Sequence, residues 1–217
     1  MDYNELKNFQ RQNRAKFSES LGLRVHRAIS WYGRAEKELE DVDAKFIFLW
    51  ISFNSAYANE GYFLHSITEQ ESFRLFMSRI CELDSNKLID KLIWEKYTSS
   101  IRILLENEYV FHAFWEYQRG DKKEDEWKSE FDKAKQFAHR ALGQHRSTDV
   151  LNVVFSRLYT LRNQMLHGGS TWNSSVNRNQ LRDATAFLQD FIPIVIQISM
   201  ENHEQIWGEP CYPVVKD

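Results

Sequence analysis

The scarcity of helix-breaking residues constrains this chain more than any other feature. Its 217 residues include only eight glycines and three prolines, and two of the prolines lie within the last eight residues. So few breakers allow few turns, and no segment alternates polar and apolar side chains between hairpin turns as β-strands do. Apolar residues instead recur at intervals of three and four. We therefore expect an all-α protein, folded as a helical bundle with additional helices.

The apolar spacing predicts where these helices lie. The stretch 42–59 is apolar almost all round and should be deeply buried. Thr68 and Glu71 form a capping box that should open the next helix, and Pro193 should kink the last one. We expect one domain over residues 1–217, with a core at about 20–203 and peripheral segments at 1–19 and 204–217. The predicted helices cover about residues 21–39, 42–59, 69–80, 85–105, 124–142, 149–166 and 179–203, with a short one within 106–117.

Composition narrows the class of protein. A hydrophobic share of 42% with 14% aromatic residues indicates a packed globule. Residues 1–20 lack the apolar core of a signal peptide, and the longest apolar run, 46–53, is far too short to cross a membrane. Cys81 and Cys211 are too few for a disulfide framework or a metal cluster. We therefore expect a cytoplasmic protein without a membrane partner.

Charge is distributed unevenly along the chain. The net charge is −3, but residues 139–182 contain six arginines and one acidic residue, so a segment of +5 lies in a background of −8. Arginine suits bidentate contacts to phosphate, so this segment could bind RNA or DNA. A solvated arginine-rich surface is the alternative. The six residues are Arg140, Arg146, Arg157, Arg162, Arg178 and Arg182.

Residues 161–169, with the sequence LRNQMLHGG, are the most informative segment for function. On a helix over 149–166, the apolar residues form one stripe, and Arg162 falls inside it. A guanidinium on a core-facing stripe needs a partner, a pocket or a subunit interface. His167 precedes two glycines that should end the helix, and it could act as an acid or base. The alternative is a buried structural arginine followed by a histidine at a helix end.

The run from Arg162 through Asn163 to His167 resembles the Arg–polar–x–x–x–His motif of the HEPN family (higher eukaryotes and prokaryotes nucleotide-binding domains). Residues 27–59 also look like the opening helix pair of the larger, Apea-like HEPN proteins. The resemblance implies a dimer in which two motif helices form a composite site. Arg162 would bind the scissile phosphate, and His167 would move the proton for attack by the RNA 2′-hydroxyl. Asn163 would orient His167 or contact the backbone.

The function that the resemblance implies is a homodimeric, metal-independent endoribonuclease, in phage defence or a toxin–antitoxin system, with no cofactor. The alternative is a non-catalytic HEPN module that binds nucleotide, RNA or a partner protein; a third possibility is an unrelated helical bundle. Gly169 stands where a subgroup of HEPN toxins has a tyrosine used by a nucleotidyltransferase antitoxin, so regulation by that route is not expected. Trp172 could stack a base, or cover an edge of the core. The predicted additional RNA contacts are Arg157, Trp172, Arg178, Arg140 and Arg146.

Overall fold

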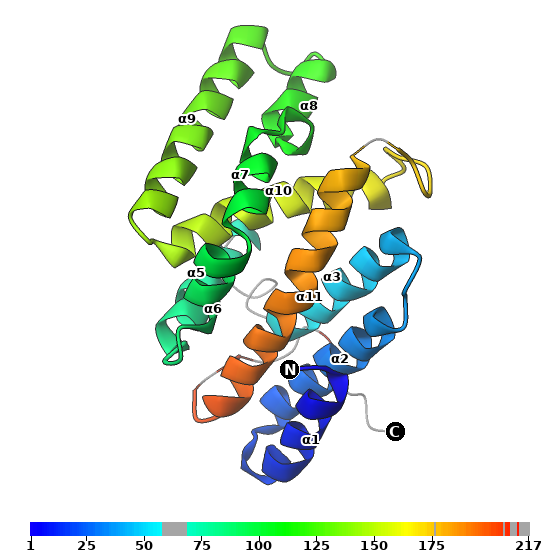
Figure 1. Cartoon of the computed structure of the whole chain (residues 1–217), viewed down its shortest axis with the longest axis vertical. Coiled ribbons are helices and arrows are strands. Elements are labelled where there is room, and N and C mark those ends of the chain that lie inside the picture. Colours follow the sequence, from blue (N-terminus) through cyan, green and yellow to red (C-terminus); the bar gives the residue numbers. More distant parts are fainter. Residues whose placement is uncertain (58–68, 176, 206, 209–211, 213–217) are drawn as a thin grey trace. The chain divides into compact units, whose positions relative to one another are not determined.

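The computed structural model describes residues 1–57, 69–175, 177–205, 207–208 and 212, and these residues form helices and connecting turns with no strand (Figure 1). The predicted all-α class is therefore confirmed. The chain divides into two compact units. We call residues 1–86 and 185–217 the terminal unit, and residues 87–184 the middle unit. The grouping of the whole chain as one domain stays a prediction.

The predicted helices recur in the structure with shifted bounds. Residues 3–13, assigned to a peripheral segment, form a helix of their own, and Leu6 in it is fully buried. Thr68 of the expected capping box lies outside the described residues, as do residues 58 and 59. In the terminal unit the elements are α1 (Tyr3–Asn13), η1 (Arg14–Lys16), α2 (Glu19–Glu36), α3 (Val42–Tyr57) and α5 (Glu69–Leu83). In the middle unit they are α6 (Leu88–Lys91), η2 (Leu92–Lys96), α7 (Thr98–Glu106), η3 (Glu108–Val110), α8 (His112–Gln118), α9 (Glu124–Gly143) and α10 (Ser147–Leu166). Helix α11 (Arg178–Glu201) contributes residues to both units.

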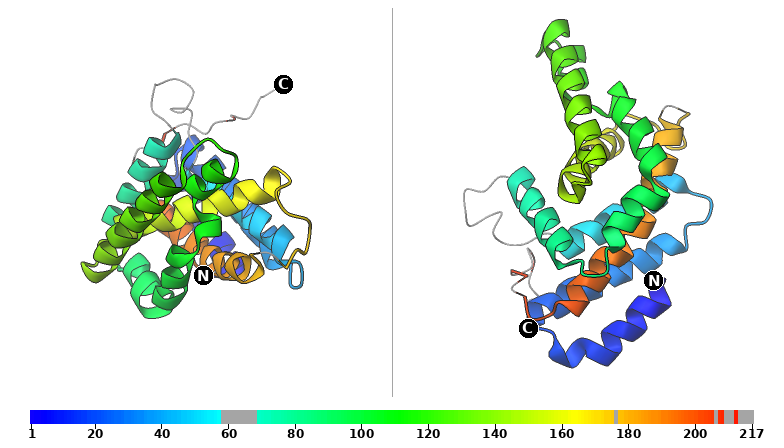
Figure 2. Two further views of the ribbon diagram at one scale, coloured as in Figure 1. Left: turned by 90° about the horizontal axis from the view of Figure 1, so that it is seen from above. Right: turned by 60° about the vertical axis from the view of Figure 1, so that its left-hand side comes forward.

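Helices α2 and α3 lie side by side and form the centre of the terminal unit (Figures 1 and 2). Leu49 and Phe53 of α3 and Ile29 of α2 are fully buried, as the apolar composition of 42–59 predicts. The hydroxyl of Ser52 is also buried, and it donates a 2.7 Å hydrogen bond to the carbonyl oxygen of Ala28. This bond satisfies a polar group that burial would otherwise leave without a partner.

Pro193 lies inside α11, which continues through it as a helix. A proline has no N–H group, so the carbonyl oxygen of Gln189, four residues earlier, loses its usual helical donor. The hydroxyl of Tyr32 donates a 3.2 Å hydrogen bond to that oxygen instead. A side chain of α2 thus compensates for the proline, and both residues belong to the terminal unit. Burial, with nearby carboxylates such as Glu36, raises the pKa of Tyr32, which keeps its hydroxyl protonated as a donor.

In the middle unit, α8 and α9 lie side by side (Figure 1). They pack through a cluster of aromatic rings. The ring of Phe114 meets that of Trp127 edge-on at 5.2 Å between centroids, and Phe131 packs beside Trp127. Edge-to-face pairs of this kind add specific geometry to the burial of apolar area. The cluster holds α9 against α8.

Candidate functional site

Helix α10 carries the motif predicted from the sequence, and its sides differ in burial. Val154, Leu158 and Leu161 on one side are almost completely buried. Tyr159 is 39% exposed and Leu166 is 49% exposed, and these two lie close to each other around the helix axis. The helix therefore has one face in the core and an outer face on which large apolar side chains are accessible.

Arg162 is half-buried at the edge between these two faces. Its Nη1 donates a 2.8 Å hydrogen bond to Oδ1 of Asn163, and its guanidinium carbon lies 5.6 Å from the centre of the Tyr159 ring. Its Nε is buried and has no hydrogen-bond partner among the described residues. The guanidinium is thus oriented by its neighbour while some of its donors remain available.

On α10, Arg157 and not Arg162 is the buried arginine. It is 2% exposed, and its guanidinium carbon lies 4.3 Å from the ring centre of Phe111 and 5.5 Å from that of Phe131. Its Nε and Nη2 have no hydrogen-bond partner in the described part of the chain. Burial lowers the pKa of Arg157 to about 10. Its position does not offer the guanidinium to a surface-bound RNA, in contrast to the role predicted from the sequence.

The two glycines end α10 as predicted. Gly168 has a φ of 72°, a left-handed conformation that favours glycine. The N–H of Gly169 donates a 2.7 Å bond to the carbonyl oxygen of Gln164, which is the six-to-one bond of a Schellman motif. A Cβ on Gly169 would lie 3.0 Å from that same oxygen. The side chain of His167 is exposed at this helix end.

The structure does not bring Arg162 and His167 of one chain into contact. No hydrogen bond among the described residues joins them, and their positions on an ideal helix differ by about 140° around the axis. Asn163 is the one predicted site residue bonded to Arg162. It also accepts, through its backbone oxygen, a 3.0 Å bond from the N–H of His167. Asn163 is therefore the physical link between the other two motif residues.

Gln164, within the motif, links α10 to two neighbouring segments, and the sequence did not single it out. Its Nε2 donates a 2.6 Å bond to the carbonyl oxygen of Tyr109 in η3. Its Oε1 accepts a 3.2 Å bond from the side-chain amide of Asn177, just before α11. Only its place on the polar side of the helix hinted at such a role.

Tyr109 and Asn177 line an open groove of about 930 Å³ in the middle unit. The ring of Tyr109 is 48% exposed. Glu106 is paired there: His139 donates it a 3.0 Å hydrogen bond, and Lys135 lies 3.4 Å away. The bond from His139, followed by the charge of Lys135, lowers the pKa of Glu106. The lining residues are Arg102, Ile103, Glu106, Asn107, Glu108, Tyr109, Asn177 and Gln180.

The other predicted RNA contacts are spread over the middle unit and have local partners. Arg146 forms a 2.8 Å ion pair with Asp149. Arg140 donates to the carbonyl oxygen of Gln136 at 3.3 Å, and Arg178 donates to that of Ser174 at 2.8 Å. Trp172 is 73% exposed in the loop after α10.

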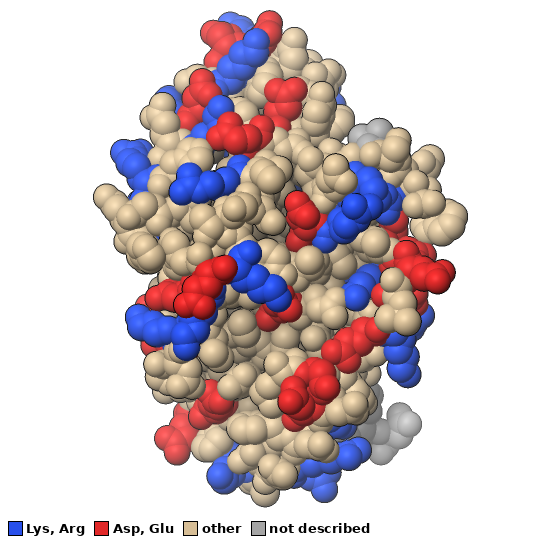
Figure 3. Space-filling model, in the orientation of Figure 1, with Lys and Arg blue, Asp and Glu red and all other residues tan. Residues whose placement is uncertain are grey.

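Charge differs between the two units. The middle unit has 16 lysines and arginines against 13 aspartates and glutamates, a net of +3, whereas the terminal unit has 12 against 18, a net of −6. On the face drawn in Figure 3, basic and acidic side chains are interspersed.

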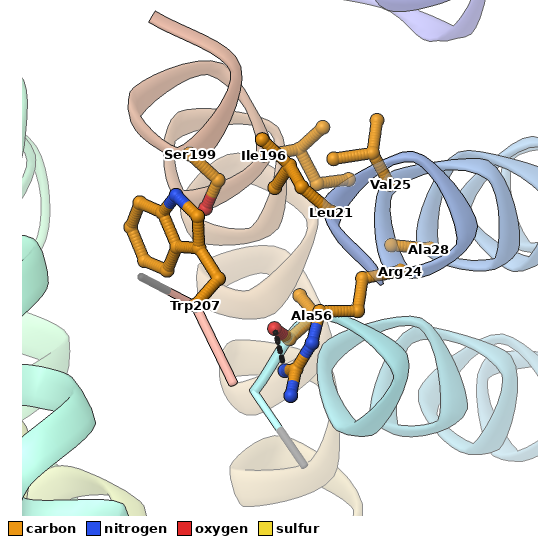
Figure 4. Close-up of a pocket in the computed structure, with 8 residues that line it drawn as sticks. All are labelled: Leu21, Arg24, Val25, Ala28, Ala56, Ile196, Ser199 and Trp207. Atoms are coloured by element: carbon orange, nitrogen blue, oxygen red, sulfur yellow. Dashed lines mark hydrogen bonds between the residues drawn. The ribbon is translucent and has the colours of Figure 1, made fainter. Parts of the chain in front are cut away.

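The terminal unit contains a small cavity of about 10 Å³. Arg24, Ser199 and Trp207 are among the residues around it (Figure 4). Nη1 of Arg24 donates a 3.2 Å bond to the carbonyl oxygen of Ala56, near the end of α3, where helical carbonyls lack a donor from their own helix. The cavity holds no more than a single water, so it is not a candidate ligand site.

Comparison with protein-family models, with curated proteins and with solved structures found no match to this chain. In the part of the chain that the structure describes, no helix is long and apolar enough to cross a membrane. The same residues contain no group of three or more histidine, cysteine or acidic side chains placed to hold a metal ion. The fold and the site together define an all-α protein with an arginine–asparagine pair and an exposed histidine at the end of α10.

Proposed function

We propose that the protein is a metal-independent endoribonuclease of the HEPN type that acts as a homodimer, in phage defence or a toxin system. One observation carries the proposal: Arg162 is oriented by Asn163 beside a helix end where His167 is exposed. A guanidinium held in one orientation suits a phosphate, and an exposed imidazole suits proton transfer near neutral pH.

The proposed dimer is supported by the geometry of one chain. Arg162 and His167 point in different directions on α10, so one copy alone makes a poor site. An isologous contact between two α10 helices would place both pairs around one axis. Tyr159 and Leu166, exposed within about 60° of Arg162 around the helix, supply apolar area for such a contact.

In the proposed reaction, Arg162 binds the non-bridging oxygens of the scissile phosphate and offsets the charge that develops on them. His167 accepts the proton of the adjacent 2′-hydroxyl, and the freed oxygen attacks phosphorus. The bond from phosphorus to the 5′-oxygen breaks, and that oxygen takes up a proton. The products are a 2′,3′-cyclic phosphate and a 5′-hydroxyl. Asn163 fixes the orientation of the Arg162 guanidinium.

Cleavage of RNA in the presence of EDTA tests this proposal. Because each side chain acts on the reacting groups, we expect Arg162→Ala and His167→Ala to lower the rate roughly 100-fold or more. Arg74→Ala and His26→Ala, which replace exposed residues of the terminal unit, should cleave like the wild type. Mass spectrometry should find cyclic phosphate ends.

Equal cleavage by all variants, or loss of cleavage on adding the chelator, would contradict the mechanism. Salt-sensitive RNA binding by a protein that does not cleave would instead identify the non-catalytic HEPN module.

A further inference from the structure

The groove lined by Tyr109 has no part in the proposed chemistry, yet it is tied to the motif. Gln164 is bonded to the groove on both sides, through the carbonyl oxygen of Tyr109 and the side chain of Asn177. His167 follows Gln164 by three residues, which is within one helical turn of about 5.4 Å along the axis. The groove therefore lies next to the end of α10.

The backbone of Tyr109 is held by three hydrogen bonds from its own segment and from α8 and α10. Its N–H donates a 2.8 Å bond to Oδ1 of Asn107. Its carbonyl oxygen accepts two bonds, at 2.6 Å from Gln164 and at 2.8 Å from the indole of Trp115. Its ring meets Phe114 edge-on at 5.4 Å between centroids. A half-exposed ring fixed in this way loses little conformational entropy when it stacks on a ligand.

The groove offers the chemistry that a nucleobase requires. The Tyr109 ring supplies a stacking surface. The amide side chains of Asn107, Asn177 and Gln180 carry both donors and acceptors, which match the edges of unstacked bases. Glu106 is paired with His139 and Lys135, which reduces its repulsion of a nearby phosphate backbone. Arg102 adds a planar cation to the lining.

We propose that this groove binds a base of single-stranded RNA, stacked on Tyr109, beside the end of α10 at which His167 would act on the scissile phosphate. The proposal rests on the proposed function for the position of that phosphate. The two hydrogen bonds of Gln164 then fix the position of the base site relative to the end of α10. The substrate class is single-stranded RNA, because the bases of a duplex are not free to stack on a protein ring.

Binding of a short 2′-O-methyl RNA, measured by fluorescence anisotropy with the full chain, tests the proposal. This probe lacks the attacking hydroxyl and stays intact, so binding is measured apart from cleavage. We expect Tyr109→Ala to weaken binding roughly ten- to hundredfold, and Tyr109→Phe to bind like the wild type, because the ring is what stacks. Tyr212→Ala is the matched control, since Tyr212 is an exposed tyrosine of the terminal unit, and it should leave binding unchanged.

A second measurement does not depend on the folding of a variant. Wild-type protein is photo-crosslinked to a single-stranded RNA that carries 5-iodouracil, and the crosslinked peptide is identified by mass spectrometry. We expect the peptide that contains Tyr109. A crosslink only elsewhere, or equal binding by Tyr109→Ala and wild type, overturns the groove proposal while RNA cleavage by Arg162 and His167 still stands. If the groove instead takes up a partner protein and no RNA binds, the groove proposal is overturned as well.

Discussion

Two arginines five positions apart on α10 have opposite environments. Arg162 lies at the helix edge with a hydrogen bond to Asn163. Arg157 lies between the rings of Phe111 and Phe131, with no hydrogen-bond partner for Nε and Nη2 among the described residues. A cation over aromatic faces recovers part of the cost of burial. Burial nevertheless lowers the pKa of Arg157, so we expect a net cost to remain. A shift of this size corresponds to about 3 kcal/mol between the two protonation states.

Substitution of Arg157 tests this account. At pH 7 we expect the free energy of unfolding of Arg157→Met to equal that of the wild type or to exceed it by up to about 3 kcal/mol. The substitution removes an uncompensated charge and keeps most of the side-chain volume. Arg157→Ala should lie about 2 kcal/mol or more below Arg157→Met because it leaves a cavity. Urea denaturation measures both. Arg140→Met, at an exposed position of α9, should change stability by no more than about 0.5 kcal/mol.

The pH dependence has a defined sign. Below pH 10, Arg157 is charged in both states and the burial cost is fully present. As the pH rises through about 10, the folded state releases a proton that the unfolded state keeps, so the wild type gains stability relative to Arg157→Met. The measurement is the free energy of unfolding of the wild type and of Arg157→Met at each pH. A difference between these two free energies that stays constant from pH 8 to 11 would contradict this account.

At the scale of elements, a π-helical segment interrupts the helix predicted over 85–105. The hydroxyl of Thr98 donates to the carbonyl oxygens of Ile93 and Trp94, and residues 92–96 form a π-helical segment, η2. This segment places Trp94 so that its indole donates a 3.0 Å bond to the carbonyl oxygen of Leu142 and its ring stacks on His145 at 4.5 Å. Through Trp94, the π-helical segment thus contacts the end of α9 and the turn between α9 and α10.

Gln164 has a similar connecting role at the other end of α10. We expect Gln164→Leu to speed amide exchange in residues 107–111 and 171–177, because both segments lose a hydrogen bond to α10. The free energy of unfolding should fall by about 1 kcal/mol. Hydrogen exchange followed by mass spectrometry resolves the two segments. Gln136→Leu, at an exposed position of α9, is the control, and unchanged exchange in Gln164→Leu would show that these bonds do not hold the groove.

At the scale of the whole molecule, the proposed site requires a second copy of the chain. The apolar side chains on the outer face of α10 are Tyr159 and Leu166, and both are substantially exposed. An apolar area beside a motif that is incomplete in one chain is consistent with a subunit contact. In the proposed dimer, Tyr159 and Leu166 should therefore supply apolar surface that the contact buries.

Light scattering tests the dimer directly. We expect the mass of a dimer for the wild type and of a monomer for Leu166→Glu, because a buried carboxylate without a partner opposes association. Leu39→Glu changes a leucine that is 86% exposed in the terminal unit, and it should remain dimeric. A wild type that is monomeric at every concentration would refute the composite site, and a dimeric Leu166→Glu would place the interface elsewhere.

The sequence alone predicted most of the helices and the end of the motif helix. The spacing of Val154, Leu158 and Leu161 depends only on the helical repeat, and a Gly168–Gly169 pair ends a helix by its own backbone preferences. These are local properties, so they can be read from neighbouring residues. The all-α class and the bounds of α9 and α10 follow from such signals to within two residues.

The tertiary structure decided which polar residues are buried and which segments they join. The sequence placed Arg162 inside the apolar stripe and Arg157 among the RNA contacts, but Arg157 is the buried arginine because Phe111 and Phe131, from distant segments, enclose it. The bond that Gln164 donates likewise depends on η3, 55 residues earlier in the chain. Helical periodicity specifies the direction of a side chain around its own axis, whereas its partners depend on how other helices pack against that side.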